Sequence, residues 1–258
     1  SFTGNKGEMK PTEMSSDLQE LAENYHEQLV EQIAESDEEL MEKYFEGEAF
    51  TPAEEERGLR QAISQASLYP VFAGSANANW GVSHILDLMI RFFPTPEDGH
   101  AMTAVNRSGE SFQIKTDQDG PLAALVFKTI VDPFVGKISL FRVYSGVFKD
   151  SGSVYNVNKE TDERINGLYS MCGKKQISVD SVIAGDIGAT TKLNDTSTLD
   201  TLTDRDNPLK IEAPEMPTPS LTLAISAVNE GEDDKIMQGL VRLKDEDIVF
   251  EIANNPET

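Results

Sequence analysis

The chain of 258 residues is long for one domain and fits two or three small ones. Hydrophobic residues make up 38% of it and charged residues 26%, which is typical of a soluble globular protein. Of its net charge of −23, residues 1–100 carry −14 (6 Lys and Arg against 20 Asp and Glu), which argues against broad contact with nucleic-acid phosphates there. Such an acidic surface either aids solubility or docks a basic protein.

Several further functions are excluded by what the sequence lacks. No stretch approaches the roughly 20 apolar residues that span a bilayer, and no secretory pattern opens the chain. A single cysteine, Cys172, forms no internal disulfide and no cysteine metal site by itself. The three histidines, His26, His84 and His100, do not have the spacing of metal ligands. The sequence therefore predicts a cytoplasmic protein without a metal site.

Residues 15–36 are predicted to form an amphipathic helix, which either Ser15 or Ser16 can cap. Glutamates cover its outer face. Its apolar residues recur at helical spacing and form a stripe that is expected to pack inward: Leu18, Leu21, Tyr25, Leu29 and Ile33.

Two shorter helices and half of a βαβ unit are predicted next. Residues 37–47 and 51–66 predict the two helices, each with a capping residue at its start. Residues 68–76 form an apolar run that ends in small residues, which is typical of a strand, and 81–96 predict a helix that two prolines stop. A strand, a glycine-containing turn and a helix make one half of a βαβ unit.

From about residue 98 the chain consists of short β-rich runs, separated by turns with Gly, Asp, Asn and Ser. Strands of this length and spacing predict a closed barrel or a sandwich. A proline-rich linker at 212–220 follows. Beyond it the pattern predicts a strand at 220–228, a helix from about Glu232 to Asp245 and a strand at 248–252.

Segments from nearly the whole chain resemble, in order, the translation elongation factor G family. The stretch FKTIVDPFVGKISLFRVYSGVFKDSGSVYN, residues 127–156, strongly resembles domain II of that family. The other matching segments are the helical insert of the GTPase domain (36–62), the end of that domain (70–96), later barrel strands (182–193 and 198–204) and the start of domain III (214–247). GKKQISVD and TTKL are more similar to the elongation factor G-like branch.

The resemblance implies a multi-domain α+β chain. Residues 1–98 would hold the helical insert and the C-terminal end of an α/β P-loop GTPase domain, residues 99–213 the translation-factor β-barrel of domain II, and residues 214–258 an incomplete ferredoxin-like domain III. It also implies a fragment of a ribosomal GTPase that uses GTP and Mg²⁺ in its full-length form, in translocation or in ribosome recycling.

Most of the residues that GTP chemistry needs are absent from the sequence. GTP hydrolysis requires a glycine-rich loop that ends in Lys and Ser or Thr, and no such loop occurs in these 258 residues. Residues 5–8 (NKGE) imitate the guanine-reading motif without a preceding strand, and 117–120 (DQDG) imitate the magnesium motif in the wrong order. The latter stretch is predicted to be a turn.

One nucleotide motif does match the family. GSA at 74–76 follows the predicted strand, and the resemblance implies that Ser75 and Ala76 contact the guanine base through backbone N–H groups. The next residues, 77–81 (NANWG), depart from the usual Phe-Lys-Asn-Lys-Gly of the family. The fragment by itself is therefore not expected to bind or hydrolyse GTP.

The resemblance implies two contacts with the ribosome. The family's helical insert docks on the basic end of the large-subunit stalk protein, and Glu31, Glu35 and Glu38 have the spacing of one helical face that could do so. Lys137 and Arg142 in the domain II segment are predicted to contact the backbone of small-subunit ribosomal RNA. For both sets the alternative is that the charged side chains are only solvated and bind no partner.

Two other functions remain open. The fragment could come from a ribosomal protection or peptide-release GTPase. From a different class, it could be a non-enzymatic module that binds the ribosome or a protein through its barrel. Residues 132–146 contain no nucleophile–base pair and no metal cluster, so they are predicted to be scaffold.

Overall fold

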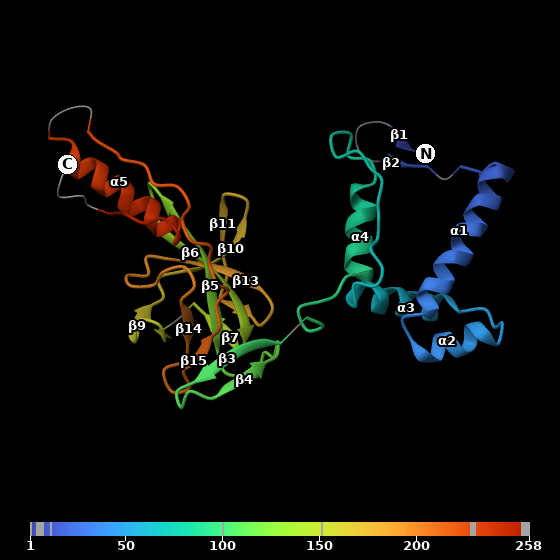
Figure 1. Ribbon diagram of the computed structural model, residues 1–258, viewed down its shortest axis with the longest axis horizontal. Helices are drawn as coiled ribbons and strands as arrows, with labels where there is room; N and C mark the ends of the chain where they lie inside the picture. The colour runs from blue at the N-terminus through green and yellow to red at the C-terminus, as the bar shows by residue number, and fades with distance from the viewer. Residues whose placement is uncertain are drawn as a thin grey trace. The chain divides into compact units, whose positions relative to one another are not determined.

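The computed structural model describes residues 2–3, 8–10, 12–99, 101–150, 152–227 and 231–253. Contacts divide the chain into two compact units, Ser1–Gly99 and His100–Thr258. Helices dominate the first unit and β-sheets the second, as Figure 1 shows, so the mixed α+β class predicted from the sequence is confirmed.

The described part of the first unit contains the predicted helices and one short strand pair. These elements are α1 (Ser16–Ala34), α2 (Glu38–Phe45), α3 (Pro52–Ser64) and α4 (Val82–Phe92), with β1 (Phe2–Thr3) paired to β2 (Glu8–Met9). Ser15 is the N-cap of α1 but its side chain makes no capping hydrogen bond.

Side-chain caps fix the starts of α2 and α3. Asp37 accepts hydrogen bonds from two backbone N–H groups of the first turn of α2. Thr51 and Glu54 form a reciprocal capping box at α3, and Lys43 donates to Glu54 at 2.7 Å. The hydrogen bond from Lys43 and those from Thr51 lower the pKa of the Glu54 carboxyl to about 2. Local sequence therefore sets where these helices begin.

The first unit has only a small core, where the end of α1 meets α2 and α3. Ile33 and Leu40 are buried there, and a Cβ at Gly58 would lie 2.5 Å from Ile33 and 2.6 Å from Leu40, so α3 approaches closely because this residue is a glycine. The prediction that the whole α1 stripe packs inward is wrong. Its first three members stay about half exposed because the packing reaches only the last turns of α1: Leu18, Leu21 and Tyr25.

The predicted strand at 68–76 does not form. A strand exists only as part of a ladder, and no described segment of the first unit pairs with residues 68–74. Only an isolated antiparallel bridge is present, between Ser75 and Trp80. Helix α4 forms as predicted, yet it buries no residue, and Leu86 and Ile90 are exposed.

The second unit is built from antiparallel strands. Its largest sheet has the order β11-β10-β13-β6-β5-β14-β8-β9, beside a β12-β7 pair and a three-stranded sheet, β15-β3-β4. The strands are β3 (Met102–Asn106), β4 (Ser111–Ile114), β5 (Ala123–Asp132), β6 (Gly136–Ser145), β7 (Val147–Lys149), β8 (Ser153–Asn156), β9 (Thr161–Arg164), β10 (Leu168–Cys172), β11 (Lys175–Ser178), β12 (Ser181–Ile183), β13 (Ile187–Thr191), β14 (Thr201–Thr203) and β15 (Leu209–Ile211).

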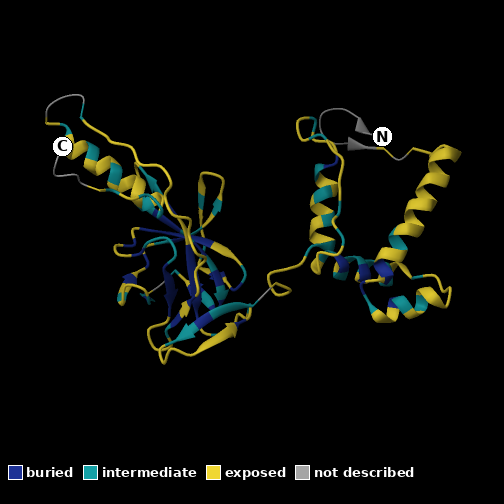
Figure 2. Ribbon diagram, viewed as in Figure 1, coloured by how far each residue is buried: buried dark blue, intermediate teal, exposed yellow. Residues whose placement is uncertain are grey.

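Two hydrophobic clusters lie on opposite faces of the β5–β6 hairpin. Ala124, Val126 and Phe141 belong to the larger cluster, whereas Ala123 and Leu125 belong to the smaller one, which the three-stranded sheet covers. Successive residues of a strand point to opposite faces, so the uninterrupted apolar run of β5 is explained by burial on both sides. Figure 2 shows the buried residues of this unit gathered at these strands.

A buried carboxylate holds the loop between β13 and β14. Glu163 in β9 is 1% exposed and accepts hydrogen bonds from the backbone N–H groups of Asn194, Asp195 and Thr196 and from the Thr196 hydroxyl, at 2.7–3.0 Å. Asn156 donates to the same Thr196 hydroxyl at 3.1 Å. These donors satisfy a charge that would otherwise be costly to bury.

The C-terminal segment forms the predicted helix but not the predicted strands. Helix α5 (Asp233–Glu246) begins and ends within one residue of the prediction. The described parts of 220–228 and 248–252 have no ladder, because no described strand lies beside them to pair. The end of α5 contacts the β5–β6 hairpin, where Glu246 accepts from the Val131 N–H at 2.7 Å.

Removal of the Glu163 carboxylate is expected to destabilise the second unit. Glu163→Ala removes the acceptor of three backbone N–H groups and of the buried Thr196 hydroxyl, so the free energy of unfolding should fall by about 3 kcal/mol. Asp206→Ala, at an exposed residue of the same unit, should change it by less than about 0.5 kcal/mol. Urea unfolding of both variants measures the difference, and equal effects would contradict a structural role for the buried carboxylate.

Candidate functional site

The predicted guanine loop is a tight turn closed by its own backbone. The Ser75 N–H donates to the Trp80 carbonyl at 3.0 Å, and the Trp80 N–H donates back to Ser75 at 2.9 Å. The Ser75 hydroxyl accepts from the Ala78 N–H at 3.4 Å. Gly81 follows with a φ of +75° and is the N-cap of α4. The bridge therefore fixes the connection into this helix.

Ser75 and Ala76, which the resemblance assigns to guanine contact, differ in whether their backbone N–H groups are available. The Ser75 N–H is already engaged by Trp80, so it is not available to a base while the loop keeps this geometry. The Ala76 N–H has no hydrogen-bond partner among the described residues. An oxygen acceptor of a ligand would thus find its donor at Ala76 rather than at Ser75.

Of the two look-alike motifs, only DQDG at 117–120 lies fully within the described residues. Asp117 accepts from the Asp119 N–H at 3.0 Å, and its carbonyl accepts from the Gly146 N–H at 2.7 Å, so DQDG is a turn packed on the end of β6. Most of the NKGE stretch, residues 5–7, lies outside the described residues.

The three glutamates predicted to meet the stalk protein do not share one helix face. Helix α1 ends at Ala34, Glu35 is its C-cap, and Glu38 opens α2. The prediction of a continuous helical spacing is therefore wrong, because Asp37 caps a new helix between them. The three residues still lie within one exposed corner of the chain, from the last turn of α1 to the first turn of α2.

These three carboxylates are free, unlike several other acids of the same unit. Among the described residues, Glu31, Glu35 and Glu38 make no ion pair. The paired acids nearby are Asp37 and Glu39 with Arg57, Glu54 with Lys43, Glu55 with His26, and Glu56 with Arg91. A basic partner would therefore find uncompensated charge at the α1–α2 corner.

The two residues predicted to contact RNA are both engaged within the chain. Lys137 Nζ lies 3.5 Å from Asp245 Oδ1 of α5 and is 21% exposed. The Arg142 guanidinium lies over the Tyr144 ring, 5.3 Å from its centroid, and its Nε is buried with no hydrogen-bond partner in the described structure. Exposed lysines are found instead at the β10–β11 turn, Lys174 and Lys175.

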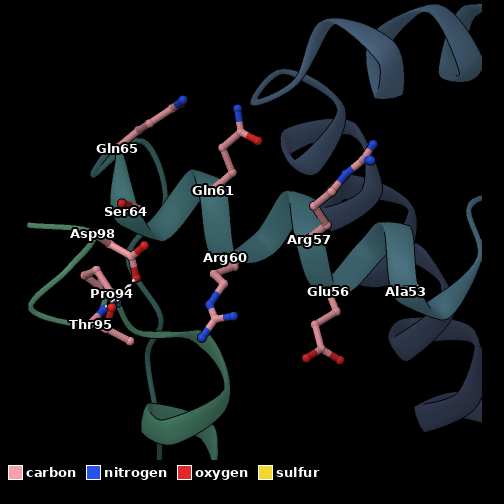
Figure 3. Close-up of a pocket in the computed structure, with 10 residues that line it drawn as sticks. All are labelled: Ala53, Glu56, Arg57, Arg60, Gln61, Ser64, Gln65, Pro94, Thr95 and Asp98. Carbon is pink, nitrogen blue, oxygen red and sulfur yellow. Dashed lines mark hydrogen bonds between the residues drawn. The ribbon is translucent and has the colours of Figure 1, made fainter.

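A polar pocket of about 930 Å³ lies between α3 and the segment after α4, and the sequence did not predict it. Its lining residues, drawn in Figure 3, are Ala53, Glu56, Arg57, Arg60, Gln61, Ser64, Gln65, Pro94, Thr95 and Asp98. The spacing of Arg57 and Arg60 on one helix was the only sequence signal.

Most charges of this pocket are used internally. Arg91 binds Glu56, and this contact lowers the pKa of the Glu56 carboxyl. The Thr95 N–H and hydroxyl donate to Asp98 and lower its pKa. Figure 3 shows Arg60 extending from α3 toward Pro94 and Thr95, and Arg60 has no ion pair within 4 Å in the described structure. The lining contains no histidine or cysteine.

No metal site and no membrane helix occur in the part of the chain that the structure describes. No group of three or more His, Cys, Asp or Glu side chains there could hold a metal ion. None of the described helices is both long and apolar enough to cross a bilayer. His100 lies outside the described residues.

Comparison with known proteins finds one matching family model and a similar solved structure. Residues 121–205 match the family model "Elongation factor G domain 2". The chain is also similar to a solved crystal structure of a Thermus thermophilus protein, described as "ttk003000868", with a TM-score of 0.80 and 27% sequence identity. The match covers 98% of this chain but 36% of that one, so this chain spans about a third of its length. The resemblance of residues 121–205 to domain II of the elongation factor G family is thus confirmed.

A substitution at Gly74 is expected to open the guanine loop. A Cβ at this residue would lie 2.8 Å from the Trp80 carbonyl oxygen, closer than real Cβ atoms come, and the obstacle is backbone. Gly74→Ala should therefore break the Ser75–Trp80 bridge while α4 stays folded. Trp80 is the single tryptophan, so its fluorescence should shift to longer wavelength. Ala73→Gly, one residue earlier, is the control, and unchanged Trp80 emission in Gly74→Ala would refute the constraint.

Proposed function

We propose that this chain, which carries domain 2 of the elongation factor G family at residues 121–205, is part of a translational GTPase that acts on the ribosome. The observation that carries the proposal is this domain match inside a chain of which 98% aligns with one solved structure. The antiparallel unit would be the scaffold that meets the ribosome.

GTP and Mg²⁺ would belong to the full-length protein. Bound GTP would supply the phosphoanhydride whose hydrolysis drives such a factor. In this chain the Ala76 N–H would donate to the guanine base, and the Ser75–Trp80 bridge would hold that donor in place. The phosphates would need residues beyond these 258, because the sequence contains no phosphate-binding loop.

The α1–α2 corner would be the surface that meets the large-subunit stalk protein. Its support is the uncompensated charge of Glu31, Glu35 and Glu38, beside acids that are paired. Exposed charges of this kind mainly raise association rates, and salt screens them.

Ribosomal RNA would meet the second unit. Lys137 and Arg142 keep their proposed role through their place on β6, but each would first have to leave Asp245 or the Tyr144 ring. Lys174 and Lys175 are free to reach phosphates without such a change.

The isolated chain is expected not to bind GTP measurably. One backbone donor at Ala76 replaces none of the phosphate contacts that dominate nucleotide affinity. Isothermal titration with GTP and Mg²⁺ tests this, with GDP as a second ligand. Micromolar binding of either nucleotide would show that these residues form a more complete site than proposed.

Binding to the stalk protein is expected to depend on the α1–α2 corner. The isolated basic end domain of the stalk protein should bind the chain at low salt and lose affinity at high salt. The double variant Glu31→Lys, Glu35→Lys should lower the affinity at least tenfold at low salt, because each change reverses a free charge. Biolayer interferometry at two salt concentrations gives both values.

The control variant carries the same charge change in the first half of α1. Glu20→Lys with Glu23→Lys alters two exposed acids and should keep most of the affinity. No binding of the unmodified chain at low salt would remove the stalk proposal. Equal losses in both double variants would show that net charge rather than this corner attracts the partner.

A further inference from the structure

The second unit contains an apolar cavity that the proposed function does not use. It has a volume of about 580 Å³, within the range of small-molecule sites. It lies between the outer face of the β5–β6 hairpin and the segment that follows β15. Its lining residues are Met102, Leu125, Phe127, Tyr144, Thr198, Leu199, Glu212, Ala213, Pro214 and Met216.

One wall residue is held in a strained conformation. Leu199 has a φ of +71°, in the left-handed region that a bulky side chain rarely adopts. Its N–H donates to the Val126 carbonyl at 2.6 Å, and Asp200 is tied to Ser197, so the surrounding hydrogen bonds impose this conformation. Glycine would adopt it without strain. A leucine here places an apolar side chain at the cavity at a cost in backbone energy, and such strain tends to occur at ligand sites.

A second irregularity lies on the neighbouring strand. The β5–β6 register shifts between Val126 and Lys128, so Phe127 lies at a β-bulge. Bulges re-aim side chains and often lie beside binding sites. Phe127 and Met216 line the cavity and remain 41% and 44% exposed. Two large apolar side chains are therefore left accessible around one hollow.

The cavity has one charged lining residue. The Glu212 carboxylate makes no hydrogen bond or ion pair with any described residue. Lys128 and Arg142, two cations on the same strand pair, are not lining residues, and Arg142 lies over the Tyr144 ring. Aromatic rings and thioethers accept varied apolar groups, and a ring face also attracts a cation.

We propose that this cavity, here called the Leu199 pocket, binds a small organic cation that joins an apolar or aromatic body to an ammonium group. The body would pack against Phe127, Leu199 and Met216, and the ammonium would pair with Glu212. The lining selects this class because it combines an apolar wall with a single free negative charge.

The test compares three probes of similar size on the full 258-residue chain. They are 2-phenylethylamine, the neutral 2-phenylethanol and the anionic 3-phenylpropionate. Amide chemical shifts of the labelled chain should saturate with the amine, with a dissociation constant on the order of 1 mM for so small a ligand. The shifts should centre on Phe127, Leu199 and Glu212, and the acid should bind at least tenfold more weakly.

Variants separate a binding role of Leu199 from a structural one. Leu199→Gly removes both the wall and the strain, so it should weaken amine binding at least fivefold without lowering the melting temperature. Lys192→Gly is the matched control, because Lys192 also has a positive φ, +60°, but does not line the pocket. It should keep the wild-type affinity. Glu212→Gln should abolish the preference for the amine over the alcohol.

Three results would overturn the proposal. These are no saturable binding of the amine, equal binding of the acid and the amine, or unchanged amine binding in Leu199→Gly. If Leu199→Gly does not fold, Phe127→Ala decides the same question, because this half-exposed side chain can be truncated at little cost to the core. Unchanged amine binding in that variant also rejects the pocket.

Discussion

Burial of β5 and β6 on both faces is the constraint on which the second unit depends. Antiparallel sheets commonly have one wet face, but here alternate residues of β5 enter two separate hydrophobic clusters. The larger cluster includes the stacked rings of Phe141 and Phe148, 4.3 Å apart. The smaller exists only because the three-stranded sheet covers the outer face. The hairpin therefore joins the two layers, and a polar residue in its apolar run would disturb both.

Loops around this hairpin are fixed by polar groups rather than by further apolar packing. Glu163 and Asn156 bind the chain between β13 and β14 through buried hydrogen bonds. The same short stretch contains Lys192 and Leu199, both with positive φ. A loop so firmly bonded can sustain backbone strain, since the bonds outweigh what relaxation would gain. The Leu199 pocket thus borders a loop that the Glu163 carboxylate holds a few residues earlier, at 194–196.

Helices were predictable because their signals are local. The start of α2 at Asp37 and of α3 at Thr51 follow from side chains within one turn, and both caps are present as expected. Helix α4 forms although it buries no residue. The predicted strand at 68–76 did not form for the converse reason, because an apolar run becomes a strand only where a neighbouring strand can pair with it. The strand predictions at 220–228 and 248–252 failed in the same way.

Site residues were less predictable than elements, because spacing does not show which groups are already used. Ser75 and Ala76 are adjacent in the sequence, yet the bridge to Trp80 engages only the Ser75 N–H. Likewise Glu31 and Glu39 are both acidic and exposed, but of these two only Glu39 pairs with Arg57.

Both candidate binding surfaces therefore consist of groups that have no partner within the fold. In the first unit these groups are the carboxylates of Glu31, Glu35 and Glu38 at the α1–α2 corner, which make no ion pair with any described residue, whereas Arg57 pairs with Asp37 and Glu39. In the second unit the surface is an apolar hollow with one unpaired carboxylate, at Glu212. The α1–α2 corner and the Leu199 pocket suit partners of different kinds. Long-range attraction can recruit a large basic protein to an open corner, whereas a small cavity selects by contact and excludes water. The negative charge of the chain favours cations at both places. Charge alone therefore does not determine which partner binds where, and the shape of each surface makes the distinction.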